Sequence, residues 1–86
     1  MIEKIGEKVS VLSIYDQNKG KFLPKKIIWR NKTYEINQAG YHHRLKEGKK
    51  LIHIFSVCSN DLAFRLRLDT DNLSWTLEEV ADGLGN

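Results

Sequence analysis

Histidine side chains are concentrated in two neighbouring segments of the chain. His42 and His43 are consecutive, and His53 follows in the next apolar run. Imidazole binds zinc through a neutral nitrogen and titrates near neutral pH, so these residues are the first candidates for chemistry. Adjacent residues of a strand point to opposite faces, so only one of His42 and His43 can face His53.

The turn between the two segments decides which residue lies opposite His53. A turn centred on residues 47 and 48 sets His42 there, whereas a type I turn with a left-handed bulge at Gly48 sets Tyr41 there. Even the first arrangement provides only two imidazoles, whereas catalytic zinc usually takes three protein ligands. A metal site at His42 and His53 is therefore the weaker hypothesis, and we expect partly exposed cross-strand histidines.

Other catalytic signatures are missing from the sequence. The single cysteine, Cys58, has no CxxC partner and no adjacent base, so we interpret it as a half-buried structural thiol. The chain contains no GxSxG nucleophile motif, no P-loop and no GxGxxG dinucleotide motif. We therefore predict a protein that is not an enzyme and needs no cofactor.

Basic residues dominate the first part of the chain. Residues 1–50 contain 12 basic and 5 acidic residues, a net charge of +7, whereas residues 51–86 contain 2 basic and 6 acidic residues, a net charge of −4. A basic surface attracts polyanions, so this asymmetry supports a weak nucleic-acid hypothesis. The residues that we assign to such a surface are Lys25, Lys26, Arg30, Lys32, Arg44, Arg65 and Arg67.

Two of these arginines lie in the alternating segment LAFRLRLD. Arg65 and Arg67 take the positions between its apolar residues, so both point away from the core. A two-residue loop before this segment would place Arg67 opposite Ile54. We predict that Ile54 is then exposed beside the arginines, on a mixed apolar and cationic surface. The alternative is that the arginine stems cover the outer apolar surface.

Period-two alternation of apolar residues is the dominant pattern of the whole chain and is typical of strands. It occurs in residues 7–15, 25–30, 33–44, 49–58, 62–69 and 74–80. The gaps between these segments contain Asn, Asp and Gly, which suit tight turns. We predict an all-β fold, an antiparallel meander of five to six strands that bends at Gly40 into a strongly twisted sheet or half-barrel.

Turn lengths predict the register of two hairpins. With a two-residue turn at residues 31 and 32, Trp29 faces Tyr34, and both aromatic residues belong to the core rather than to a stacking surface. With a four-residue turn at residues 70–73, Leu68 faces Trp75. Ser74 could instead cap a short C-terminal helix, which is the alternative interpretation of residues 74–82.

The chain is expected to form one domain over residues 1–86, with residues 81–86 as a flexible tail. Residues 1–10 carry two glutamates, and no apolar run in the sequence approaches ~18 residues, so we expect a cytoplasmic protein that does not enter a membrane. The predicted core consists of Val11, Ile27, Trp29, Tyr34, Ile36, Phe55, Phe64, Leu66, Leu68, Trp75 and Leu77.

Several of these core positions also carry a family resemblance. The pattern consists of Pro24, Trp29, Tyr34, Ile36, FSV at residues 55–57, FRL at residues 64–66 and Trp75-x-Leu77. It resembles a family of small bacterial domains of unknown function that occur alone or attached to DNA-repair proteins, including relatives of Y-family polymerases. Family members often have glycine where this chain has Asn31. The resemblance implies no catalytic residues and slightly favours nucleic acid as a partner.

These observations lead to three hypotheses about function. The first is a non-catalytic binding module that acts as a weak nucleic-acid accessory domain. The second is a module for protein–protein interaction, as a monomer or a weak homodimer. The third is a metal-binding protein that uses the histidines.

Overall fold

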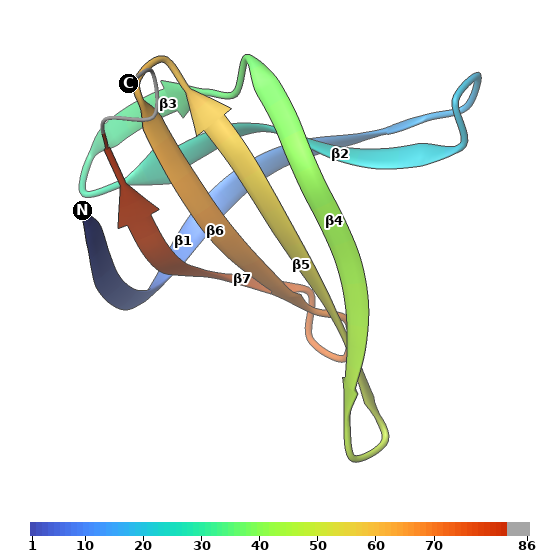
Figure 1. Ribbon diagram of the computed structural model, residues 1–86. Helices are drawn as coiled ribbons and strands as arrows, with labels where there is room; N and C mark the ends of the chain where they lie inside the picture. Colours follow the sequence, from blue (N-terminus) through green and yellow to red (C-terminus); the bar gives the residue numbers. More distant parts are fainter. Residues whose placement is uncertain (83–86) are drawn as a thin grey trace.

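The computed structural model describes residues 1–82 as an all-β chain (Figure 1). The strands are β1 (Ile2–Asp16), β2 (Lys21–Trp29), β3 (Lys32–Glu35), β4 (Gln38–Glu47), β5 (Lys50–Ser59), β6 (Leu62–Asp69) and β7 (Ser74–Ala81). The all-β class is confirmed, but the described chain forms a seven-stranded sheet rather than one of five or six strands. No helix in residues 1–82 is long and apolar enough to cross a membrane.

The extra strand arises because the predicted segment 33–44 changes partner at Ile36 and Asn37. The amide of Ile36 donates to the carbonyl of Lys25 on β2, and the next amide, that of Asn37, donates to the carbonyl of Cys58 on β5. Two consecutive residues therefore hydrogen-bond to strands near opposite edges of the sheet. Apolar alternation continues up to this point, so the pattern alone could not indicate the break.

The sheet is curled, and its two edge strands, β3 and β4, are consecutive in the chain. Neighbouring strands are antiparallel in the order β3-β2-β1-β7-β6-β5-β4, and the result is a half-barrel. Figure 1 shows two hairpin arms that leave the body in different directions, one at the β1–β2 turn and one at the β4–β5 turn. The predicted bend at Gly40 is confirmed, because the β4–β5 register shifts between Ala39 and Tyr41.

The β2–β3 hairpin differs from its prediction by one residue. Trp29 pairs with Lys32 and Ile27 pairs with Tyr34, so the turn consists of Arg30 and Asn31. Both turn residues have positive φ, 51° and 63°. This conformation matches the twist of a two-residue hairpin, and Asn tolerates it well. Trp29 and Tyr34 still meet diagonally, with ring centroids 6.2 Å apart.

The β6–β7 hairpin follows the predicted register. Leu68 pairs with Trp75 and Asp69 pairs with Ser74 across the four-residue turn. Residues 74–81 are therefore strand, and the alternative C-terminal helix is wrong. Strand pairing fixes this segment because it lies between β1 and β6 in the sheet. The predicted tail begins with Ala81, which belongs to β7, and residues 83–86 lie outside the described part of the chain.

The inner face of the sheet holds the hydrophobic core. All eleven predicted core residues belong to it: seven are buried and four, Val11, Trp29, Tyr34 and Ile36, are partly buried against it. Phe22 and Val57 are further members that the sequence analysis did not include. The core thus draws residues from the neighbouring strands β2, β1, β7, β6 and β5.

A second apolar cluster lies on the outer face of β5. Ile52 and Ile54 are 0% and 1% exposed, although both point away from the main core. Ile54 is flanked across the strands by His43 and Arg67. The prediction that Ile54 is exposed is therefore wrong, and the alternative, an arginine stem lying over outer apolar surface, is what the structure has.

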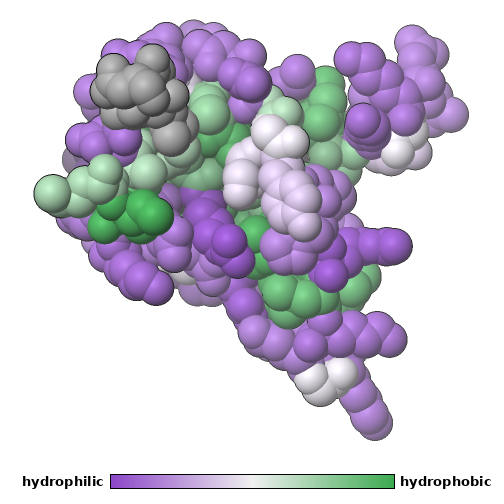
Figure 2. All heavy atoms as spheres, in the orientation of Figure 1, coloured by the Kyte–Doolittle hydropathy of each residue, from purple (hydrophilic) through white to green (hydrophobic). Residues whose placement is uncertain are grey.

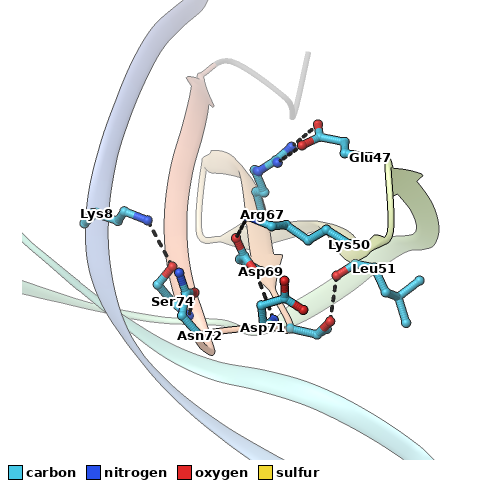
Figure 3. Close-up of polar contacts among 10 residues, drawn as sticks. Lys8, Glu47, Lys50, Leu51, Arg67, Asp69, Asp71, Asn72 and Ser74 are labelled. Carbon is cyan, nitrogen blue, oxygen red and sulfur yellow. Dashed lines mark hydrogen bonds and ion pairs between the residues drawn. The ribbon is translucent and has the colours of Figure 1, made fainter.

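Ion pairs cross the outer face of the same strands (Figure 3). Arg67 on β6 forms two hydrogen bonds to the carboxylate of Glu47, and Lys50 Nζ lies 3.0 Å from Asp69 Oδ2. These charges hold long side chains across β4, β5 and β6. The pairs lower the pKa of Glu47 and of Asp69, chiefly through the hydrogen bonds from Arg67 and Lys50.

Candidate ligand groove

A groove opens between the β1–β2 arm and β4. β3 pairs only with residues 26–29 of β2, so residues 21–24 have β1 on one side and no strand on the other. Pro24 suits this free edge, where a missing amide hydrogen removes no ladder hydrogen bond. β4 likewise pairs only with β5. The residues that line the groove are Tyr15, Gly20, Lys21, Phe22, Leu23, Ala39, Gly40, Tyr41, His42, Arg44, His53, Phe55 and Val57.

The groove encloses about 660 Å³, which falls in the ordinary range of small-molecule sites. It is open along its length, as expected for a space between two separated strand edges. Figure 2 shows hydrophilic residues at the tips of both arms and apolar residues at the surface between them. The site is thus a trough with an apolar floor rather than a closed cavity.

A chain of aromatic rings forms the floor and joins it to the core. The ring of His42 stacks on Phe55, with centroids 4.2 Å apart and planes at 10°. Phe55 contacts Trp75 at 5.4 Å, and Trp75 stacks on Phe22 at 6.2 Å. Tyr15 stands opposite Phe22 on β1 and is 61% exposed. Rings of this kind can stack with planar groups of a ligand.

His42 and His53 come together in the groove, although neither predicted register is right. The β4–β5 turn lies further along the chain than either prediction placed it: Arg44, rather than His42 or Tyr41, pairs with His53, and His42 pairs with Phe55. The two histidines are diagonal neighbours, and His42 Nε2 lies 2.7 Å from His53 Nδ1. Desolvation is the main cause that lowers the pKa of both imidazoles, and Arg44 contributes to each.

The histidine pair does not extend to a metal-binding set. Within residues 1–82 no group of three or more His, Cys, Asp or Glu side chains could hold a metal ion. His43 points to the outer face of β4, where its ring lies against Tyr41 at 5.1 Å. The two nitrogens that face each other, His42 Nε2 and His53 Nδ1, share a hydrogen bond. The charged residue beside them is the cation Arg44. The donor set does not fit zinc.

Positive charge enters the groove from both walls. Lys21 lies on β2 and Arg44 on β4, and no described lining residue is acidic. Asp16 pairs with Lys21 across β1 and β2, and its carboxylate accepts hydrogen bonds from the amides of Asn18 and Lys19 within the turn. The groove lining therefore combines cations and aromatic rings, and none of its described residues is a carboxylate.

The basic residues predicted for a nucleic-acid surface are spread over β2, the β2–β3 turn, β3, β4 and β6. Three arginines are paired with glutamates: Arg30 with Glu7 at 2.6 Å, Arg65 with Glu78 at 3.0 Å and Arg67 with Glu47. Lys25 and Lys26 lie on β2, and Lys32 begins β3. Only Arg44 of the predicted set lines the groove.

Sequence analysis missed the residues of the β1–β2 arm. Tyr15, Lys21 and Phe22 line the groove, but their segment lies on the fringe of the alternating pattern. The useful signal was the single proline: Pro24 within a strand indicates a free edge, and free edges border open sides of sheets.

Comparison of the chain with protein-family models, with curated proteins and with solved structures found no match. Fold and groove together define a small half-barrel of antiparallel strands with a cationic, aromatic trough. The resemblance to domains attached to DNA-repair proteins stays a prediction.

Proposed function

We propose that this protein is a non-catalytic binding domain that holds single-stranded nucleic acid in the groove. The observation that carries the proposal is the composition of the groove lining, which contains aromatic rings and two cations but no carboxylate among the described residues. Single-stranded nucleic acid presents what such a lining attracts: regularly spaced phosphates and unpaired bases with exposed faces.

The small size of the groove and its small number of cations predict weak binding. The groove spans only a few nucleotides, and Lys21 and Arg44 are its only lysine or arginine lining residues in the described chain. Few phosphates are neutralised by so small a surface, so a dissociation constant of roughly micromolar or weaker at low salt is expected, and affinity should fall as salt rises. Stacking adds ~1 to 3 kcal/mol for each base that lies on an aromatic ring.

Fluorescence anisotropy with a labelled single-stranded oligonucleotide tests the proposal. We expect binding at low salt that is weaker for the duplex of the same sequence, because paired bases offer no free face to the groove. Lys21→Glu and Arg44→Glu should each reduce affinity several-fold. Lys49→Glu is the matched control, because Lys49 is exposed in the β4–β5 turn and does not line the groove.

Two results would contradict nucleic-acid binding in the groove. One is the absence of binding to any single-stranded oligonucleotide at low salt. The other is equal loss of affinity in Lys49→Glu and Arg44→Glu, which would indicate a general charge effect without a site.

A protein partner is the second candidate function, and a different surface favours it. Leu12, Ile14 and Ile28 are 55%, 45% and 47% exposed on the outer face of the β1–β2 hairpin. An apolar cluster of this kind is typical of a contact surface. Light scattering at increasing protein concentration tests it. Self-association that Ile14→Lys abolishes would support a homodimer, and a monomer at all concentrations would remove the homodimer form of this candidate.

A further inference from the structure

The contact between His42 and His53 fixes how many protons the pair carries. A separation of 2.7 Å between His42 Nε2 and His53 Nδ1 requires one proton between them, donated by either ring. In the neutral pair, the donating ring has a bare nitrogen at its other position and the accepting ring has an N–H there. The outward nitrogens, Nδ1 of His42 and Nε2 of His53, are therefore one donor and one acceptor.

One further proton changes this arrangement without breaking it. When the bare outward nitrogen is protonated, both outward nitrogens become donors, and the proton between the rings stays in place. A second added proton would put hydrogens on both inward nitrogens, which cannot then remain 2.7 Å apart. The intact pair can thus gain a single positive charge, and it titrates as one unit.

The groove supplies cations near this pair but no anion. Arg44 is the cross-strand partner of His53, and Lys21 faces them from β2. Phe55 and Trp75 bring no charge, and the phenols of Tyr15 and Tyr41 are the other ionisable side chains among the described lining residues. A protonated pair therefore has no counter-ion among the described lining residues.

Carboxylates at the ends of neighbouring strands make contacts outside the groove lining. Asp16, the cross-strand partner of Lys21, accepts turn amides, and Asp69 pairs with Lys50 on the outer face. Glu47, at the end of β4, is bound by Arg67. An external anion is what would complete the site.

We propose that the groove contains a proton-linked subsite for a phosphate group, formed by Arg44 and the His42–His53 pair, which offers one outward N–H to the phosphate. This inference rests on the proposed function and specifies where a phosphate of the ligand is held. Arg44 provides a permanent charge, and the histidine pair adds a second positive charge beside its N–H donor once it has taken up a proton. Phosphate binding and protonation of the pair then strengthen each other.

The linkage sets the expected pH dependence. Burial and Arg44 lower the pKa of both histidines, so at pH 7.5 the pair is neutral and the subsite relies on Arg44. A bound phosphate raises the pKa of the pair. Because one proton is taken up, affinity should rise as pH falls by no more than about tenfold per pH unit. Between pH 7.5 and 5.5 we expect a gain of roughly five- to thirtyfold.

Two probes separate the sources of the phosphate group. Inorganic phosphate is titrated into the full chain while the imidazole resonances are followed by NMR. A short single-stranded oligonucleotide, whose phosphodiesters keep one charge each between pH 5.5 and 7.5, is then titrated at both pH values. We expect both probes to shift His42 and His53, to leave His43 unchanged and to raise the pKa of the pair.

Variants assign the pH dependence to the pair. The double variant His42→Phe/His53→Phe removes both imidazoles, and the ring that replaces His42 can still stack on Phe55. It should bind the oligonucleotide at pH 7.5 and lose the gain at pH 5.5, whereas either single variant leaves one imidazole that can take up a proton. His43→Phe is the matched control on the outer face of β4, and it should keep the gain. Thermal unfolding of each variant checks that the fold is retained.

The outcomes distinguish this inference from the proposed function. If the oligonucleotide binds and the double variant His42→Phe/His53→Phe keeps the full gain at pH 5.5, the subsite is wrong and nucleic-acid binding stands. If inorganic phosphate shifts His42 and His53 but no oligonucleotide binds, the subsite stands and the proposed function is wrong. If His42 and His53 take up two protons with the wild-type contact intact, the inference is overturned.

Discussion

His42 lies flat on Phe55, with ring centroids 4.2 Å apart and an interplanar angle of 10°. His42 is exposed, whereas Phe55 is 3% exposed and packs against Trp75 in the core. One aromatic residue thus forms both the floor of the groove and part of the hydrophobic core. Changes in the groove are therefore expected to affect the stability of the whole domain.

Acidification should destabilise the fold through the histidine pair. Burial holds the pKa of His42 and His53 below the ordinary value of 6.5 in the folded state. As pH falls through 6.5, the unfolded chain takes up protons first, so stability is lost until the folded pKa values are also passed. Urea unfolding at pH 7.5 and pH 5.0 measures the loss. His42→Phe should lose less than the wild type, and equal losses would show that other groups are responsible.

Removal of the buried side chain of Ile54 should weaken the domain. Ile54 is 1% exposed, and Ile54→Ala is expected to lower the free energy of unfolding by about 2 to 4 kcal/mol. Ile28→Ala is the matched control, because Ile28 is 47% exposed on the outer face of β2. It should cost less than about 1 kcal/mol in the same urea experiment. If the two variants lose equal stability, the outer face of β5 is not a packed cluster.

The case of Ile54 shows where sequence patterns reach their limit. Alternation and loop length predicted that Ile54 lies opposite Arg67, and this register is confirmed. They did not predict burial, because the cover comes from long side chains on β4 and β6 that fold over the outer face. The alternation correctly assigned Ile54 and Arg67 to the outer face, but a residue on the outer face is not always exposed.

The groove was harder to predict than the core. The core depends on the period of the strands, which the sequence contains directly. The groove depends on the break at Ile36 and Asn37, where two neighbouring amides bond to different strands. That event leaves the first part of β2 and the whole of β4 as free edges. The histidine contact needed a turn position known to within one residue, which turn chemistry alone did not fix.

Two turn positions should respond to substitution in opposite directions. Leu73 has φ of 61° and is 71% exposed, so Leu73→Gly should relieve backbone strain and raise the free energy of unfolding by about 0.5 to 1 kcal/mol. Gly48 has φ of 62°, and a Cβ there would meet no atom within 4 Å. Gly48→Ala should therefore lower stability by about 1 kcal/mol through backbone strain alone. Thermal unfolding of both variants measures the two shifts, and shifts of the same sign would contradict this account.

Removal of the arginine charge should lower oligonucleotide affinity in the groove more than at the paired arginines of the outer face. Arg65 and Arg67 are bound to Glu78 and Glu47, so each pair presents little net charge to a polyanion. Arg65→Gln and Arg67→Gln should change oligonucleotide affinity by less than about twofold at 0.1 M salt, where screening limits distant charges. Arg44→Gln, the same chemical change, should reduce affinity several-fold because Arg44 lines the groove. Fluorescence anisotropy with one labelled oligonucleotide compares the three variants. A larger loss in Arg65→Gln or Arg67→Gln than in Arg44→Gln would move the binding surface to the outer face of β6.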